Sequence, residues 1–224
     1  QIQSLVSTLR DAAAGLHATD LYRQTTASST APAVVTASTT AKAVPGTYSL
    51  VVSQLAAAQS VVGPTGQFAS ADAAVGQGTL TIRLGAWDSA RTAFTPKAGA
   101  SDIAVVIDAA DDTLAKVRDK INAAGAGVVA SIVTDASGPR LSIQSAETGA
   151  ANGFRVTVAD ADGNHTDAAG LSRLAYDGAI AGQSQLLFAR AAADSAAAVN
   201  GIAVTGTSNT LAEVVEGITF TLAK

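Results

Sequence analysis

The residues that could carry out chemistry are few and mostly acidic. The segment Asp160-Ala161-Asp162-Gly163-Asn164 places carboxylate and amide oxygens at alternate positions, as calcium-binding loops do. The rest of the calcium pattern is missing, because the glycine stands at the fourth place and Leu171 occupies the place of the bidentate glutamate. The segment therefore favours a polar turn, and no metal site is predicted.

Three aspartates near residue 110 could pair as a general acid and a general base. Asp108, Asp111 and Asp112 stand, however, at the start of an expected helix, where acids satisfy free backbone amides and the positive end of the helix dipole. His165 stands among acidic residues, but no serine lies in the Gly-x-Ser-x-Gly turn that a hydrolytic triad of this kind would use. No catalytic site is predicted.

Three other motifs are weak indicators of function. The pairs Gly76-Gln77-Gly78 and Gly125-Ala126-Gly127 lack the third glycine and the acidic residue of a dinucleotide site. Asn164-His165-Thr166 matches a glycosylation sequon, a short pattern that often occurs by chance. Trp87 is the only tryptophan and stands in a polar passage, where core packing is the first expectation and an exposed binding contact the alternative.

The composition of the 224 residues excludes further classes of function. The chain has no cysteine and two histidines, so thiol chemistry, disulfides and Cys-ligated metal sites are excluded, and no cofactor is predicted. The net charge of −4 and the scattered Lys and Arg residues offer no basic stripe for nucleic acid. The apolar runs are far shorter than the roughly 20 residues of a membrane span. Because the sequence begins with Gln1, it is expected to be a piece of a longer chain.

The only long helical pattern lies in residues 1–24. Apolar residues recur there at three- and four-residue steps, among them Ile2, Leu5, Leu9 and Leu16, and form a narrow seam of heptad type. Such a seam has to lie against another helix, and its partner is expected beyond Lys224 or on another subunit. The alternative is an ordinary surface helix that packs on the domain. Residues 25–40, rich in Ser, Thr and Ala, are expected to form an extended linker.

After residue 40 the apolar period changes to two, which is typical of β-strands. Strands are predicted over 47–53, 79–84, 103–108, 128–134, 140–145, 154–159, 196–199, 202–205 and 218–222. Asn200-Gly201, between two of them, is the pair that best adopts a type I′ hairpin turn. A helix is predicted from 111 through Asn122, and the similar sequence from Asn209 predicts a second short helix that begins at Thr210. The fold class is therefore α+β, with two small, mostly antiparallel β domains that each contain a short helix.

Three segments resemble a known family. Residues 111–124, with Thr113, Leu114, Ile121 and Asn122, resemble the "IN" motif of flagellar hook-associated proteins. Residues 46–59 resemble the start of the head of the filament-capping protein. Residues 199–222, with Asn200, Gly201 and Thr210, resemble the segment that closes that head. The three matches follow in the right order, and the family they indicate is flagellar hook-associated protein 2.

The resemblance implies a non-enzymatic structural cap at the extracellular tip of the bacterial flagellar filament. In that family a ring-like homo-oligomer promotes the folding and polymerisation of flagellin, so the implied partners are further copies of the chain and flagellin. An adhesive head that binds host mucin or glycan is the alternative. The implied layout is a leg-helix stub with its linker in 1–30, a first head domain in 31–68 and 186–224, and an inserted second head domain in 69–185.

Overall fold

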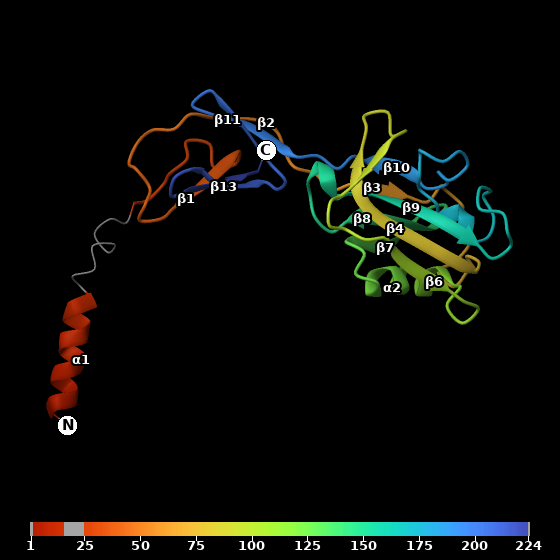
Figure 1. Ribbon diagram of the computed structural model, residues 1–224, viewed down its shortest axis with the longest axis horizontal. Helices are drawn as coiled ribbons and strands as arrows, with labels where there is room; N and C mark the ends of the chain where they lie inside the picture. Colours follow the sequence, from red (N-terminus) through yellow and green to blue (C-terminus); the bar gives the residue numbers. More distant parts are fainter. Residues whose placement is uncertain (1, 16–24, 224) are drawn as a thin grey trace. The chain divides into compact units, whose positions relative to one another are not determined.

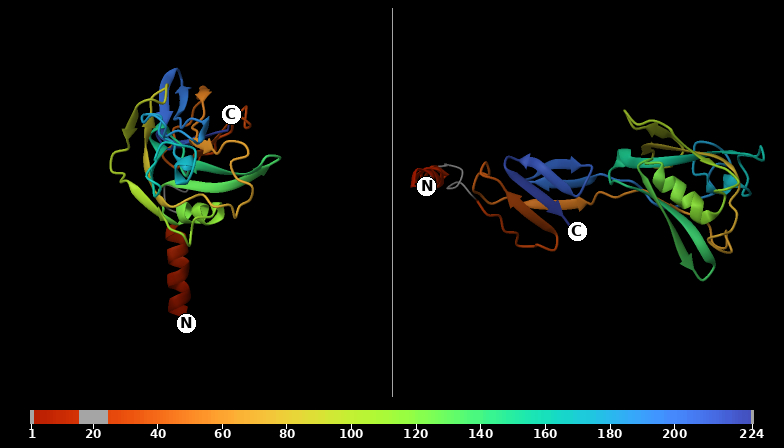
Figure 2. Two further views of the ribbon diagram at one scale, coloured as in Figure 1. Left: turned by 90° about the vertical axis from the view of Figure 1, so that its right-hand side faces the viewer. Right: turned by 90° about the horizontal axis from the view of Figure 1, so that it is seen from below.

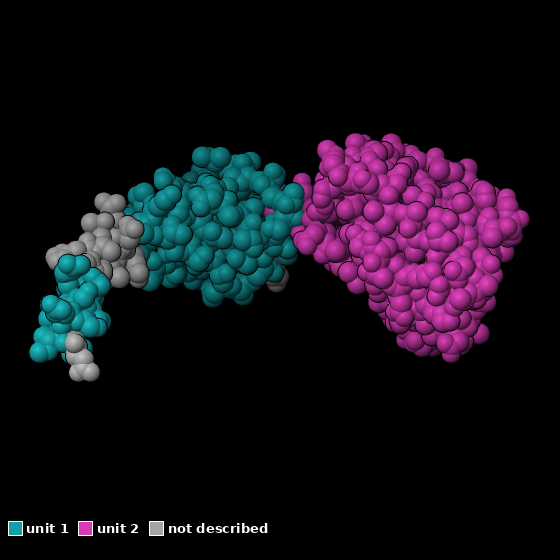
Figure 3. Space-filling view, turned by 60° about the horizontal axis from the view of Figure 1, so that its bottom comes forward, with its two compact units in different colours: residues 1–55, 196–224 teal, residues 56–195 magenta. Residues whose placement is uncertain are grey.

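The computed structural model describes residues 2–15 and 25–223 (Figure 1). An N-terminal helix, α1 (Ile2–Gly15), precedes the β-strands, and the seam position Leu16 lies outside the described residues. The chain forms two compact units, residues 1–55 with 196–224 and residues 56–195 (Figure 3). The larger unit is thus inserted into the smaller one along the chain. The predicted α+β class with one mostly antiparallel domain inserted in the other is confirmed.

The smaller unit contains two three-stranded sheets. The first has the order β1-β14-β13, with β1 (Val35–Thr39), β14 (Ile218–Leu222) and β13 (Thr210–Val215). The second has the order β12-β11-β2, with β12 (Ile202–Gly206), β11 (Ser195–Val199) and β2 (Leu50–Gln54). Apolar side chains of both sheets form one core, because period-two alternation puts every second residue on the same face. The buried members are Ala43, Ala197, Val199, Leu211, Ile218, Phe220 and Leu222.

Two predictions for the smaller unit are wrong. The segment 25–40 is not wholly a linker, because β1 pairs with β14 along its length, from Val35 opposite Leu222 to Thr39 opposite Ile218. The helix predicted from Thr210 is strand β13, which forms a hairpin with β14. Its three apolar positions, Leu211, Val214 and Val215, fit a helical face as well as a strand, and pairing with β14 overrides the local pattern.

The larger unit contains two four-stranded sheets. One has the order β10-β3-β8-β7, with β10 (Leu187–Arg190), β3 (Ser60–Val62), β8 (Gly138–Ser145) and β7 (Val128–Asp135). In the other, β4 (Gly78–Trp87) pairs along its length with β9 (Gly153–Asp160) and at its two ends with β6 (Ile103–Ile107) and β5 (Phe94–Pro96). Two 3₁₀ turns, η2 (Ala150–Asn152) and η3 (Leu171–Leu174), complete the unit.

Helix α2 (Leu114–Ala123) packs beside β7 and β6, as Figures 1 and 2 show. Its buried residues are Leu114, Val117 and Ile121, which lie on one face of the helix at i, i+3 and i+7. They join a core that includes Leu80, Ile82, Leu141, Ile143 and Phe154. No helix among the described residues has the length and apolar character that crossing a membrane would require.

The compact units divide the chain at other points than the predicted head domains do. Residues 56–68 and 186–195 were assigned to the first head domain, and the structure moves them into the larger unit. The reason is strand pairing: β3 lies between β8 and β10, so both flanking segments complete a sheet of the larger unit. Short strands such as the three residues of β3 give too little alternation to indicate their sheet from the sequence.

Candidate functional site

The first candidate surface is the apolar face of α1. Every described side chain from residue 2 to residue 13 is exposed, and Ile2, Leu5 and Leu9 remain 79%, 69% and 71% exposed. Together with Val6 these residues stand at i, i+3, i+4 and i+7, on one side of the helix. An apolar stripe of this spacing gains little in water and is the surface that a second helix covers.

The motif residues of α2 fix the helix to its sheet. The Thr113 hydroxyl accepts a hydrogen bond from the Lys116 amide at 3.4 Å, so Thr113 is the N-cap, and the expected capping aspartates Asp111 and Asp112 are not. Leu114 and Ile121 are fully buried. The Asn122 amide donates to the Ala130 carbonyl at 2.9 Å and accepts from the Ala130 amide at 2.7 Å, which joins the end of α2 to β7.

Asp111 forms an ion pair with Lys120 instead of capping the helix. The hydrogen bond from Lys120 lowers the pKa of the Asp111 carboxyl, and the same bond raises the pKa of Lys120. Asp108 accepts from the Ala110 amide at 2.9 Å and so holds the turn before α2. The contacts of these acids lie within the fold, and none of them forms an acid and base pair around a cleft.

The motif residues near the C-terminus form a hairpin. Asn200 and Gly201 have φ angles of 49° and 83°, which the type I′ turn requires, and connect β11 to β12 as predicted. The Asn200 side-chain oxygen accepts from the Ser49 amide, and the Asn200 amide donates to the Ser49 carbonyl, each at 2.8 Å. These two hydrogen bonds connect the turn to the segment before β2. Thr210 lies at the exposed start of β13, where its amide donates to Ser208.

The acidic loop that invites a calcium interpretation is a polar turn. Asp160 accepts from the amide of Ser172 at 2.8 Å and from its hydroxyl at 3.1 Å, and the Asp160 amide donates to His165 Nδ1 at 2.9 Å. These contacts use the oxygens and the imidazole nitrogen that a cation would need. Within residues 2–15 and 25–223, no group of three or more His, Cys, Asp or Glu side chains could hold a metal ion.

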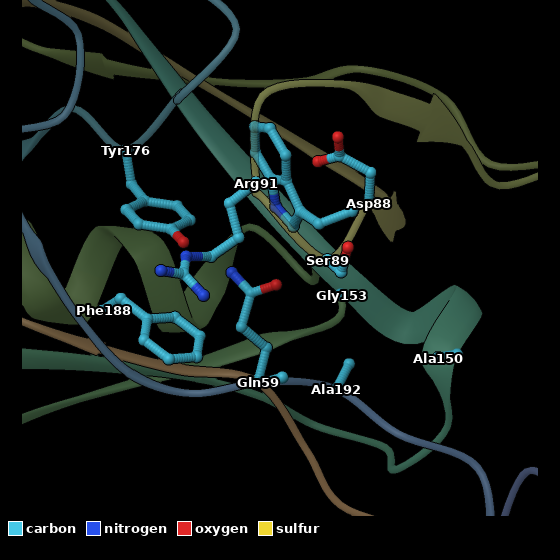
Figure 4. A pocket seen from close by; sticks show the side chains of 11 residues that line it. Gln59, Asp88, Ser89, Arg91, Ala150, Gly153, Tyr176, Phe188 and Ala192 are labelled. Atoms are coloured by element: carbon cyan, nitrogen blue, oxygen red, sulfur yellow. The ribbon is translucent and has the colours of Figure 1, made fainter.

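Trp87 lines a pocket of about 190 Å³ in the larger unit. Figure 4 shows side chains that line this pocket. We call it the Trp87 pocket, and it is lined by Gln59, Trp87, Asp88, Ser89, Arg91, Ala150, Gly153, Tyr176, Phe188, Ala191 and Ala192. Trp87 is half-buried and packs against Phe94, with 4.9 Å between the ring centroids, and against Tyr176, with 5.9 Å. Trp87 therefore packs on the core, as first expected, and it also lines a pocket, while the alternative of a binding contact stays a prediction. Arg91, Tyr176 and Phe188 were missed, because the fold brings them together from distant positions.

Together these features indicate a class of protein. The ordered polar side chains of the motifs brace the backbone, two β units carry separate cores, and an apolar helix face stands open. This is the organisation of a modular structural protein. A family model described as flagellar hook-associated protein 2 N-terminus matches residues 1–59, and one described as flagellin hook IN motif matches residues 94–147.

Similar known proteins belong to the family that these two family models indicate. The B-type flagellar hook-associated protein 2 of Pseudomonas aeruginosa is 33% identical over 98% of this chain and 44% of its own length. A structure of the flagellar cap protein FliD from Escherichia coli matches with a TM-score of 0.78 and 30% identity, over 98% of this chain and 56% of that one. FliD from P. aeruginosa matches with a TM-score of 0.63 and 31% identity, over 85% and 79%. The chain belongs to the flagellar hook-associated protein 2 family, and it spans less than half the length of the curated relatives it matches.

Proposed function

We propose that this chain is part of a structural cap at the tip of the bacterial flagellar filament, outside the cell. In this proposal a ring-like homo-oligomer promotes the folding and polymerisation of flagellin, and the chain has no enzymatic role. Support comes from its family, whose members bear the names flagellar hook-associated protein 2 and flagellar cap protein. The motif residues agree with a structural role, because their contacts hold helices and turns in place.

The observation that carries the proposal is the open face of α1. Ile2, Leu5 and Leu9 are apolar, aligned and more than two-thirds exposed. Full burial of one such side chain contributes about 1.5–3 kcal/mol of free energy. A second helix that packs along this face buries several of these side chains, so their contributions add to the stability of the pair. We infer that α1 is a leg helix that pairs with another helix of the assembled cap, and that the two β units form the head.

The test compares oligomeric states of a chain that continues to the full length of the curated relatives. The double variant Leu5→Asp/Leu9→Asp puts two charges on the apolar face, and we expect it to sediment as a monomer at concentrations where the unaltered chain forms rings. The matched control, Gln3→Asp/Ser7→Asp, adds the same charge on the opposite side of α1 and should still assemble. In cells that lack the native cap gene, only the control should restore filaments and motility.

Two results would contradict the proposal. An unaltered full-length chain that stays monomeric at every concentration would remove the ring. Normal filament growth with the Leu5→Asp/Leu9→Asp variant would show that the α1 face does not serve assembly.

A further inference from the structure

The Trp87 pocket contains one guanidinium, that of Arg91, one carboxylate, that of Asp88, and several polar groups whose hydrogen bonds lie within the fold. The Gln59 amide bonds both backbone groups of Phe154, at 2.8 and 3.1 Å. The Asp88 carboxylate accepts from the backbone amides of Thr92 and Ala93, at 2.7 and 3.1 Å, and from the Thr92 hydroxyl at 3.0 Å. The indole N–H of Trp87 donates to the Phe154 carbonyl at 2.9 Å. These contacts engage Gln59 and the Trp87 indole, and they hold Asp88 in the turn before Thr92.

The unused polar groups of the pocket are Arg91, Tyr176 and Ser89. The Arg91 guanidinium stacks 4.0 Å from the centroid of the Phe188 ring, and none of the ion pairs formed by the described residues includes it. Tyr176 is only 5% exposed, and its hydroxyl forms no hydrogen bond with another described residue. The hydroxyl oxygen itself is not one of the fully buried unpartnered atoms, so it can be reached from the pocket that Tyr176 lines. Figure 4 shows this hydroxyl directed toward the Arg91 guanidinium.

The backbone around Arg91 forms a tight turn. Arg91 has a φ of 59°, in the left-handed region that non-glycine residues rarely adopt. The Asp88 carboxylate holds this turn by accepting from the amides of Thr92 and Ala93. Gly178 lies so close to the turn that a side chain there would collide with the Arg91 carbonyl. Such a backbone conformation occurs in tight turns, as at Asn200, and also at ligand sites.

We propose that the Trp87 pocket binds a carboxylate carried on a small apolar or aromatic body, with the carboxylate at Arg91 and Tyr176 and the body against Trp87. Guanidinium groups pair with carboxylates through two parallel hydrogen bonds. A tyrosine phenol is protonated at neutral pH and can donate, and burial raises the pKa of Tyr176 further. Pockets for drug-sized ligands begin at about 300 Å³. This pocket of about 190 Å³ therefore takes one small acid or one side chain of a peptide.

The fluorescence of Trp87 provides the assay, because it is the only tryptophan in the chain. Sodium phenylacetate should change the emission saturably, with a Kd of roughly 1 mM, and the neutral isostere phenylacetamide should not. The blocked dipeptides Ac-Phe-Glu-NH₂ and Ac-Phe-Gln-NH₂ form a second pair. Response to phenylacetate alone assigns the pocket to free acids, whereas response to the Glu dipeptide assigns it to an acidic segment of a protein. A response to neither acid overturns the proposal.

Variants test which groups hold the carboxylate. Arg91→Asn removes the charge and keeps a residue type that tolerates the positive φ, and it should weaken phenylacetate binding about tenfold or more. Tyr176→Phe removes only the hydroxyl and should also weaken binding. Arg118→Gln, which removes a partly exposed charge on α2, should leave the affinity unchanged. Equal phenylacetate affinity of Arg91→Asn and the unaltered chain would overturn the proposal. Methyl galactoside serves as a neutral sugar probe, and saturable binding of it that persists in Arg91→Asn would also overturn the proposal.

Discussion

At the scale of single residues, amide side chains form hydrogen bonds with backbone groups that no neighbouring strand pairs. Each of three such side chains donates to the carbonyl and accepts from the amide of one backbone residue. The pairs are Gln59 with Phe154, Asn122 with Ala130, and Gln183 with Val158. Backbone groups left without partners inside a protein are costly, so these contacts stabilise strands where the sheet ends.

Asn122→Ala tests this role at the residue that carries the family motif. The substitution removes two hydrogen bonds to Ala130, and we expect the larger unit to lose about 1–2 kcal/mol of unfolding free energy. Urea unfolding followed by Trp87 fluorescence measures the loss. The exposed Gln144 on β8 gives a matched control, since Gln144→Ala should change stability by less than about 0.5 kcal/mol. Equal effects of the two variants would contradict the assigned role.

At the scale of elements, most local patterns were predictable and distant pairing was not, although the local pattern from Thr210 wrongly predicted a helix in place of β13. The β7–β8 hairpin, the β11–β12 hairpin and α2 depend on residues close in the sequence, and all three were predicted. Strand β1 was missed because its alternation of Val, Ala, Ser and Thr is weak and its partner, β14, is far along the chain. The Trp87 pocket was missed for the same reason, since only Trp87 itself drew attention in the sequence.

Two glycines of the smaller unit allow a comparison of turn requirements. Gly201 and Gly217 have φ angles of 83° and 71°, but only Gly217 lies against other backbone, that of Ala43. We expect Gly201→Ala to destabilise the unit by about 1–2 kcal/mol through backbone strain alone. Gly217→Ala adds a collision and should cost more. Chemical unfolding followed by circular dichroism measures both, and Gly201→Asn should be the mildest variant because Asn tolerates this region. A milder effect at Gly217 than at Gly201 would refute this argument.

At the scale of the whole molecule, each unit has a core of its own. The buried cluster around Phe154 belongs to residues 56–195, and the cluster around Phe220 belongs to the smaller unit. The insertion of one domain in the other was expected from the resemblance, whereas its limits depend on the short strands β3 and β10, whose pairing no local pattern indicates.

Separate cores predict separate unfolding transitions. Phe154→Ala should lower the stability of the larger unit by about 3–5 kcal/mol, and Phe220→Ala should do the same to the smaller unit. Calorimetry should resolve two transitions, of which each variant moves one. Trp87 emission, which reports on the larger unit alone, should follow only Phe154→Ala. A single transition that both variants shift equally would mean that the units unfold together.

The pairing of β1 with β14 also determines how the smaller unit responds to mechanical tension. Val35 lies opposite Leu222, and the Ala223 amide donates to the Val34 carbonyl at 2.8 Å, so β1 begins beside the end of β14. Tension applied at these two strand ends acts across the strands, along the hydrogen bonds, and loads them one after another from the Val35 end. The unit therefore unzips at low force. The larger unit, inserted between Leu55 and Ala196, carries no load until that happens.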